Sequence, residues 1–365
     1  MQVLDDPMLD RVFLNHLVQD EIPASSVLDI SNSGKILIIS DLHMGYGSHD
    51  DLKHNGEMLT CLLEEYYYKK DWILILNGDI EELQRYPLDN IKEKWAGLYR
   101  VFDLFADEDR LYKIIGNHDD ELLFGRSLPI RLYPYMLHNV IKIETGILPA
   151  FVYHGHQLSN IYSRFNNLFR LGIRYFLKPF GIKNITGVRN PHKRFHIEKE
   201  AYAFSMKNHC LSIIGHTHRP LFESLGRLDY IKFEIESLCQ KYPVSQGEAR
   251  SKIENEVAAL RKELAKLKRK EKRDVLGQNL YGDELPVPCL FNSGSTISKK
   301  GLNAIELTNK DIALVYWFKE GKSKKFVTRG GYEIEEIPDH PYRRAVINHD
   351  KLDYIFAKIK LLGNR

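Results

Sequence analysis

The stretch KILIISDLH, residues 35–43, decides the fold class. Four consecutive apolar residues, Ile36 to Ile39, are typical of a β-strand that is buried on both faces, and the polar Ser40 and Asp41 follow directly. The same order, an apolar run followed by polar residues, recurs at 73–79, 111–119, 151–154 and 212–218. We therefore expect five buried strands, each of which ends at polar side chains.

Segments long enough for helices, 50–70 and 91–107, lie between the first three strands. This strand–helix–strand alternation predicts an α/β protein. In such sheets ligands bind beyond the carboxyl ends of the strands, which is where the polar clusters fall. Farther along, 289–291 is expected as another strand, and 305–307 and 312–316 as a closing hairpin.

Composition narrows the class of protein. With 43% hydrophobic and 28% charged residues among 365, the chain reads as a soluble globular protein rather than a disordered, collagen-like or membrane one. A net charge of +3 indicates neither a nucleic-acid binder nor an acidic scaffold. The four cysteines form no CxxC pair, so neither a disulfide framework nor a thiolate zinc site is indicated, and we expect a cytoplasmic location. No apolar run approaches the ~18 residues of a membrane helix, and the N-terminus lacks a signal-peptide pattern.

The polar clusters consist of metal-ligand types. They are Asp41-Leu42-His43, Gly78-Asp79, Gly116-Asn117-His118-Asp119, His154-Gly155 and Gly215-His216-Thr217-His218. Carboxylate, imidazole and amide donors without thiolates suit Mn, Zn or Fe rather than Ca or a structural zinc. Each motif alone is common by chance, but five in a fixed order, each after a strand, make coincidence implausible. A carboxylate such as Asp79 can bridge two ions about 3.5–4 Å apart, an arrangement used for phosphoester hydrolysis.

The series resembles the calcineurin-like metallophosphoesterase superfamily, whose pattern is DxH, GDxx[DE], GNH[DE], H and GHxH, and the resemblance spans about 35–307. It implies a four-layer αββα sandwich of two mixed β-sheets. It also implies two divalent metal ions, with manganese favoured and iron or zinc as alternatives. The implied ligands are Asp41, His43, Asp79 and His218 for one ion, and Asp79, Asn117, His154 and His216 for the other.

The expected reaction follows from charge. Two divalent ions lower the pKa of a bound water, so that a hydroxide attacks phosphorus in line without a covalent phosphoenzyme. His118, which is not a ligand in similar enzymes, is expected to protonate the leaving oxygen as general acid. The GDxx[DE] match makes Glu82 the carboxylate that orients His118, with Asp119 or Asp120 as alternatives. Those two aspartates have the rival interpretation of a helix N-cap.

Three further residues are expected as substrate contacts: His156, Arg219 and Arg164. The structural alternatives are that His156 turns away from the site and that Arg219-Pro220 turns the chain towards solvent. Asn292 and Ser293 are expected only to support the histidine loops.

The domain organisation is expected to be one phosphoesterase domain, 35–320, with an N-terminal helical extension, 1–34, and a C-terminal extension, 321–365, that ends in a helix near 350–362. Two insertions are predicted, a helical cap at 157–205 and a helical hairpin at 228–275. The cap carries nine basic and two acidic residues, and 248–273 carries ten and five. These charges predict an anionic partner, although the hairpin charges also fit a solvated helix face. Apolar residues at heptad spacing, from Ile253 to Leu267, indicate a short coiled coil for self-association or partner binding, or a shield over the site.

Three function classes remain open at this point. A phosphorylated small-molecule or lipid-linked substrate is favoured, because the aromatic and basic insert and the sequence GHTHRP are similar to the UDP-2,3-diacylglucosamine pyrophosphatase branch. The chain departs from that branch, since GNHD stands in place of GNRD and the hairpin is additional. A nuclease acting on a phosphate backbone is the less favoured alternative. A catalytically silent scaffold is the third, and it is disfavoured because every ligand position is filled.

Overall fold

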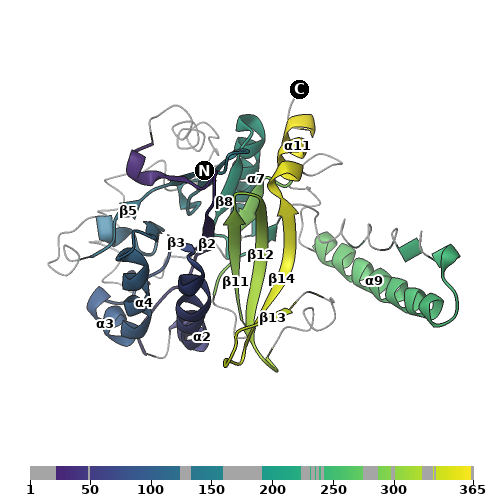
Figure 1. Cartoon of the computed structure of the whole chain (residues 1–365), viewed down its shortest axis with the longest axis horizontal. Helices are drawn as coiled ribbons and strands as arrows, with labels where there is room; N and C mark the ends of the chain where they lie inside the picture. The colour runs from purple at the N-terminus through teal and green to yellow at the C-terminus, as the bar shows by residue number, and fades with distance from the viewer. Residues whose placement is uncertain are drawn as a thin grey trace, which may run out of the picture.

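The computed structural model describes residues 22–47, 50–123, 133–158, 191–222, 242–273, 287–296, 301–322 and 334–362, together with 231, 235, 238, 239 and 332. The expected N-terminal helix, the part of the cap at 159–190 with Arg164, and most of the first arm of the hairpin lie outside these residues. Two mixed β-sheets with helices on their outer sides form the body of the protein (Figure 1). The expected αββα sandwich is confirmed.

The eight-stranded sheet holds the strands that lead into the first three polar clusters. Its order is β13-β14-β12-β11-β2-β3-β4-β5. In chain order its strands are β2 (Lys35–Ile39), β3 (Ile73–Asn77), β4 (Leu111–Ile114), β5 (Leu137–His138), β11 (Leu302–Thr308), β12 (Asp311–Lys319), β13 (Ile334–Glu336) and β14 (Tyr342–Lys351). The strands β2, β3 and β4 are parallel, so their carboxyl ends meet at one edge.

The six-stranded sheet supplies the histidine clusters, and its order is β1-β6-β7-β8-β10-β9. Its strands are β1 (Val27–Asp29), β6 (Ile141–Glu144), β7 (Pro149–Val152), β8 (Leu211–Ile214), β9 (Leu221–Phe222) and β10 (Leu290–Asn292). Because β7, β8 and β10 are parallel, the residues after β7 and β8 also meet at one edge.

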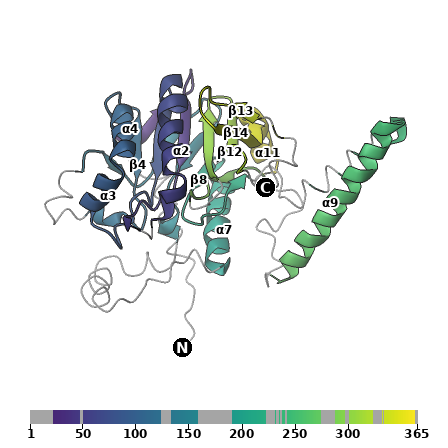
Figure 2. The same cartoon turned by 90° about the horizontal axis from the view of Figure 1, so that it is seen from below.

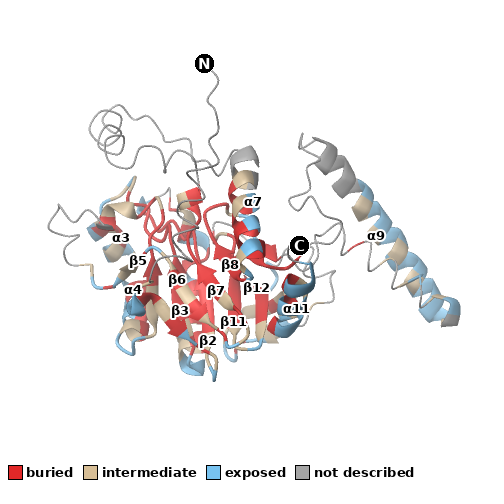
Figure 3. Ribbon diagram, turned by 90° about the horizontal axis from the view of Figure 1, so that it is seen from above, coloured by how far each residue is buried: buried red, intermediate tan, exposed pale blue. Residues whose placement is uncertain are grey.

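Strand β2 shows why the two sheets stack. Ile36 and Ile38 are buried in the cluster that contains residues of the six-stranded sheet, whereas Leu37 and Ile39 belong to the cluster that contains helical residues such as Phe102. Successive side chains of a strand point to opposite faces, so one apolar run fills both cores. Each fully buried side chain of this kind contributes about 1.5–3 kcal/mol to folding. The buried residues accordingly concentrate in the sheets (Figure 3).

The helices on the outer side of the eight-stranded sheet come from the two segments predicted between strands. The first comprises η3 (Asp51–His54), α2 (Gly56–Cys61), a π-helical stretch η4 (Leu62–Tyr67) and η5 (Tyr68–Lys70). The second comprises α3 (Leu88–Lys94) and α4 (Ala96–Ala106). Short 3-10 helices occur at η1 (Ala24–Ser26), η6 (Asp120–Leu123), η8 (His156–Leu158) and η12 (Tyr242–Val244).

Three of the helices with described bounds lie elsewhere. Helix α7 (Pro191–Asn208), which includes the last part of the predicted cap, contacts β8 and β10 of the six-stranded sheet. Helix α11 (Leu352–Leu362) packs beside β14 and matches the predicted final helix. Helix α9 (Glu248–Arg273) projects away from both sheets (Figure 2). None of the helices in the described ranges has the length and hydrophobicity of a membrane span.

The chain ends contribute more to the sheets than the sequence indicated. Val27–Asp29, within the expected helical extension, forms β1 and pairs in parallel with β6. The segment 321–365, expected as an extension, contains β13 and β14, and β14 pairs with β12 along its length. These terminal strands are therefore part of the two sheets.

Candidate metal centre

The loops after five strands converge where the two sheets meet. Asp41 and His43 follow β2, and Asp79 follows β3. The first two loops are joined by backbone hydrogen bonds, from Asp41 N–H to Gly78 O at 3.1 Å and from His43 N–H to Asp79 O at 3.0 Å. In the other sheet Gly215 N–H donates to His154 O at 3.0 Å. Backbone hydrogen bonds alone therefore join the loop after β2 to the loop after β3, and the loop after β7 to the loop after β8.

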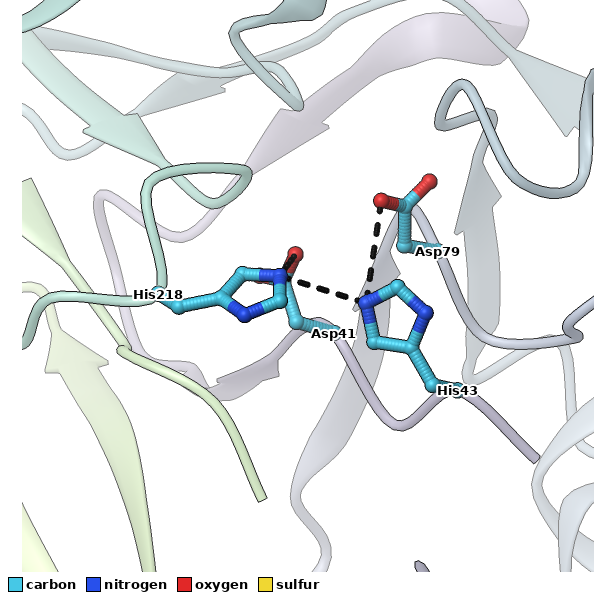
Figure 4. A group of neighbouring side chains, drawn as sticks. All are labelled: Asp41, His43, Asp79 and His218. Carbon is cyan, nitrogen blue, oxygen red and sulfur yellow. Dashed lines mark hydrogen bonds and ion pairs between the residues drawn. The ribbon is translucent and has the colours of Figure 1, made fainter. Parts of the chain in front are cut away.

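Asp41, His43, Asp79 and His218 form the first donor group. One ligand atom from each lies within 4.8 Å of those of the others (Figure 4). His218 Nε2 lies 3.1 Å from Asp41 Oδ1 and 3.2 Å from His43 Nε2. The other oxygen of Asp41, Oδ2, accepts hydrogen bonds from Ser40 Oγ at 2.5 Å and from His216 N–H at 3.1 Å. The carboxylate is thus held by one oxygen and presents the other to the group.

Asp79, His154 and His216 form the second donor group. His154 Nε2 lies 3.2 Å from Asp79 Oδ2, and the same oxygen lies 3.9 Å from His43 Nε2 of the first group. Asp79 Oδ1 accepts the His118 N–H at 2.8 Å. One oxygen of Asp79 is therefore held by the backbone, and the other faces both donor groups at once.

Hydrogen bonds to the far side of two imidazoles determine which nitrogen faces the centre. His154 Nδ1 donates to Asn77 O at 2.8 Å, and His43 Nδ1 donates to Glu82 Oε2 at 3.0 Å. In its neutral form each imidazole then carries its one proton on Nδ1, so that Nε2 has a lone pair for a metal.

The donor atoms fit a metal centre because the fold buries them without hydrogen-bond partners. Among the described residues, such atoms include Asp41 Oδ1, Asp79 Oδ2, Asn117 Oδ1, His154 Nε2 and His216 Nδ1. Leaving a buried polar atom unsatisfied costs about 1–3 kcal/mol. Five such atoms in one place, all from metal-ligating residue types, indicate that cations complete the site.

The backbone is strained at the same residues. Asp41, His43, Asp79, His216 and His218 all have positive φ, between 45° and 61°. A left-handed conformation costs a non-glycine residue about 1–3 kcal/mol and persists where the surrounding structure imposes it. The positive φ values therefore mark residues whose backbone the surrounding loops hold in this conformation.

Glu82 and His118 form a pair beside the first donor group. Glu82 Oε1 accepts a hydrogen bond from His118 Nδ1 at 2.9 Å, so this carboxylate holds both His118 and His43. The imidazoles of His43 and His118 pack edge to face, with centroids 4.7 Å apart. Asp119 takes a different position, because its oxygens accept the Gly116 and Ile80 N–H groups.

Burial and neighbouring charges shift the pKa values in opposite directions across the site. Burial, reinforced by His154, lowers the pKa of His216 to about 3, which keeps that imidazole neutral as a ligand must be. For His154, burial lowers the pKa, but the Asp79 carboxylate outweighs it and raises the pKa to about 9. Burial raises the pKa of Glu82, yet hydrogen bonds from His118 and His43 bring it down to about 2. His118 has a pKa raised to about 9, since Asp79 and Glu82 outweigh the effect of burial.

The residues expected to contact the substrate lie in different places. His156 lies near the second group, with its ring centroid 5.4 Å from that of His154. Arg219 instead pairs with the buried Glu198 of α7, which also accepts a hydrogen bond from Thr217 at 2.9 Å. Arg164 lies outside the described residues.

Several supporting residues were not singled out by the sequence analysis. Ser40 holds Asp41, and Glu198 holds the loop between His216 and His218. Lys113, inside β4, is completely buried. Of these residues, only Lys113 could have been found from the sequence, because a lysine within an apolar run must find a charged partner.

Comparison with known proteins places this geometry in a family. The model of the calcineurin-like phosphoesterase domain matches residues 34–242, more than half of the chain. A search of curated protein sequences found no significant match. The matched region contains the strand ends and both donor groups. The chain therefore belongs to the calcineurin-like phosphoesterase family and is a metal-dependent hydrolase of phosphoester bonds.

Proposed function

We propose that the protein hydrolyses a phosphate ester or phosphoanhydride by in-line attack at a two-metal centre. The observation that carries this proposal is the set of five buried donor atoms, on five converging loops, that make no hydrogen bond. Asp41, His43, Asp79 and His218 would hold one ion, and Asp79, Asn117, His154 and His216 the other. When bound, two divalent ions supply a water of lowered pKa and positive charge opposite the phosphoryl oxygens.

His118 is the general acid in this proposal. Its Nδ1 donates to Glu82, which leaves Nε2 to present a proton to the leaving oxygen. Glu82 fixes the ring and favours its protonated form, and the raised pKa of His118 supports the same role. The Asp79 carboxylate accepts a hydrogen bond from the backbone N–H of His118 and so keeps His118 beside the proposed metal position.

Manganese is the proposed metal, with iron or zinc as alternatives, because the donors are nitrogen and oxygen atoms only. Purified protein is stripped with a chelator, reconstituted with Mn²⁺ and analysed for metal. We expect two ions per chain. Less than one ion per chain, together with no turnover of any substrate below, would contradict the proposed function.

The proposed substrate is a small or lipid-linked phosphoanhydride, by similarity to the UDP-2,3-diacylglucosamine pyrophosphatase branch. The basic cap sequence at 157–205 supports an anionic substrate. A panel should contain a nucleoside diphosphate sugar-lipid, p-nitrophenyl phosphate, bis(p-nitrophenyl) phosphate and single-stranded DNA. Fastest turnover of the sugar-lipid is expected, and preferential cleavage of DNA would instead favour a nuclease.

We also propose that α9 pairs with α9 of a second copy of the chain. Its apolar positions Ile253, Val257, Leu260 and Leu264 follow heptad spacing and are only half-buried, whereas most of the other described side chains of the helix are exposed. A helix of this kind gains stability when a partner covers its apolar stripe.

Charge favours a parallel arrangement of the two helices. In a parallel pair, residues five positions apart face each other across the seam, which places Glu256 opposite Arg261. The variant Arg261→Glu should lower the dimer fraction in light scattering, and adding Glu256→Lys should restore it. A monomeric wild-type protein would contradict this pairing.

A further inference from the structure

A buried lysine lies under the loops of the metal centre. Lys113 Nζ donates to Glu81 Oε2 at 2.6 Å and to Asp119 Oδ2 at 2.8 Å, and all three side chains are fully buried. Glu81 Oε1 also accepts hydrogen bonds from the hydroxyls of Tyr99 and Tyr133, both at 2.8 Å. Taking each ion out of water costs several kcal/mol, and apolar residues often replace such groups without loss of stability. Stability alone is therefore a weak reason for this cluster.

Asp119 connects the two loops that carry Asp79 and Asn117. Its Oδ2 accepts the Ile80 N–H at 2.9 Å, and its Oδ1 accepts the Gly116 N–H at 2.6 Å. Ile80 follows Asp79 in the chain, and Gly116 precedes Asn117. The Asp119 carboxylate thus links the backbone next to Asp79 with the backbone next to Asn117. Lys113 donates a hydrogen bond to the same carboxylate.

Glu81 extends the same cluster to the first loop. Its backbone forms a parallel bridge with Met44, the residue after His43. On either side of Glu81, Met44 N–H donates to Ile80 O at 2.8 Å, and Glu82 N–H donates to Met44 O at 3.0 Å. Lys113 therefore binds a carboxylate from each of two loops, one of which is joined to the loop of His43.

We propose that Lys113 is a positioning residue that fixes the separation of Asp79 and Asn117, and with it the second metal position. This inference rests on the proposed two-metal function. Without Lys113, Glu81 and Asp119 would lose the hydrogen bonds that tie their two loops to one cation. Two buried carboxylates with no cation between them force one of them to take up a proton or to move away, and either change loosens the spacing of the loops. The first metal position depends less on this cluster, because its ligands Asp41 and His218 lie on loops that carry neither Glu81 nor Asp119.

The test is a calorimetric titration of Mn²⁺ into metal-free Lys113→Met, which keeps the length of the side chain and removes its charge. We expect one of the two sites, which the proposal assigns to the second metal position, to lose about 10- to 100-fold in affinity and the other site to change by less than about 3-fold. The matched control is Arg344→Met, which breaks the ion pair of Arg344 with Glu306 between β14 and β11. The control should lower the melting temperature without changing either Mn²⁺ affinity.

Wild-type affinity at both sites in folded Lys113→Met, or an equal loss in the control, would overturn the proposal. If Lys113→Met does not fold, Glu81→Gln carries the test, because it keeps the side-chain shape and removes one anionic partner. A weaker second site in Glu81→Gln supports the proposal, and two unchanged sites overturn it. Wild-type protein that binds no Mn²⁺ would refute the two-metal function, whereas two unchanged ions in the variants refute only the role of Lys113.

Discussion

Replacement of Glu82 by Gln should disable one of two imidazoles. Glu82 accepts a hydrogen bond from His118 on one oxygen, at 2.9 Å, and from His43 on the other, at 3.0 Å. A glutamine of the same shape has one acceptor oxygen, and its NH₂ group faces the second imidazole. That ring must then lose its hydrogen bond or move its proton to Nε2.

The size of the effect follows from the charge on the lost partner. A hydrogen bond to a charged group contributes about 1.5–3 kcal/mol, which corresponds to about 10- to 150-fold in an equilibrium or a rate. If the amide nitrogen faces His43, a proton occupies Nε2 and the Mn²⁺ affinity falls. If it faces His118, kcat falls while the metal content stays constant.

Calorimetry with Mn²⁺ and steady-state kinetics on a chromogenic ester distinguish these two outcomes. The control is Glu335→Gln, because Glu335 likewise accepts hydrogen bonds on both oxygens, from Lys70 on one and from Tyr66 and Arg344 on the other, but lies on β13. The control should match wild type in both assays. Unchanged Mn²⁺ affinity together with unchanged kcat in Glu82→Gln would refute the proposed role of Glu82.

Four further predictions address other parts of the protein. His118→Asn should lower kcat by about 10²- to 10⁴-fold with two Mn²⁺ still bound, and loss of metal would show that His118 is a ligand instead. The apparent Mn²⁺ affinity should decrease as the pH falls below about 9, because the ion must displace the proton of His154; a flat profile in calorimetry would contradict this. Phe102→Ala should lower the free energy of unfolding in urea by about 3–5 kcal/mol, since Phe102 is fully buried under the eight-stranded sheet, and wild-type stability would contradict that packing. Deletion of residues 232–273 should leave turnover of p-nitrophenyl phosphate unchanged, and its loss would show that this segment supports the site.

The site was largely predictable because its proposed ligands follow apolar runs. A run such as Ile36–Ile39 reads as a doubly buried strand, and its carboxyl end then places Asp41 at the sheet edge. The same argument places Asp79 after β3 and His154 after β7. Motif order and strand ends together were enough to anticipate which loops converge.

Strand β14 was missed for a physical reason. It runs from Tyr342 to Lys351 beside the edge strand β13, and of its side chains only that of Ala345 is fully buried. A strand in this position needs no alternation of apolar and polar residues, so its sequence reads as a polar connection. The left-handed backbone at residues such as His43 was equally unpredictable, because the contacts that impose it come from other loops.

The residues that hold the site loops in place could be identified only from the structure. Glu198, for example, lies on α7 and accepts a hydrogen bond from Thr217 across nineteen residues of chain. Nothing in local spacing links these two positions, whereas the packing of α7 on β8 brings them together. The same is true of Ser40 and Ser293, whose hydroxyls lie 2.8 Å apart although they are 253 positions apart.

The central claim is that Asp79 bridges two ions, and anomalous diffraction from crystals grown with Mn²⁺ tests it most directly. Two manganese peaks about 3.5–4 Å apart are predicted, one on each side of Asp79 Oδ2. The same data should place His43 and His218 at the first peak and His154 and His216 at the second. A single peak, or two peaks that do not share Asp79, would contradict the account.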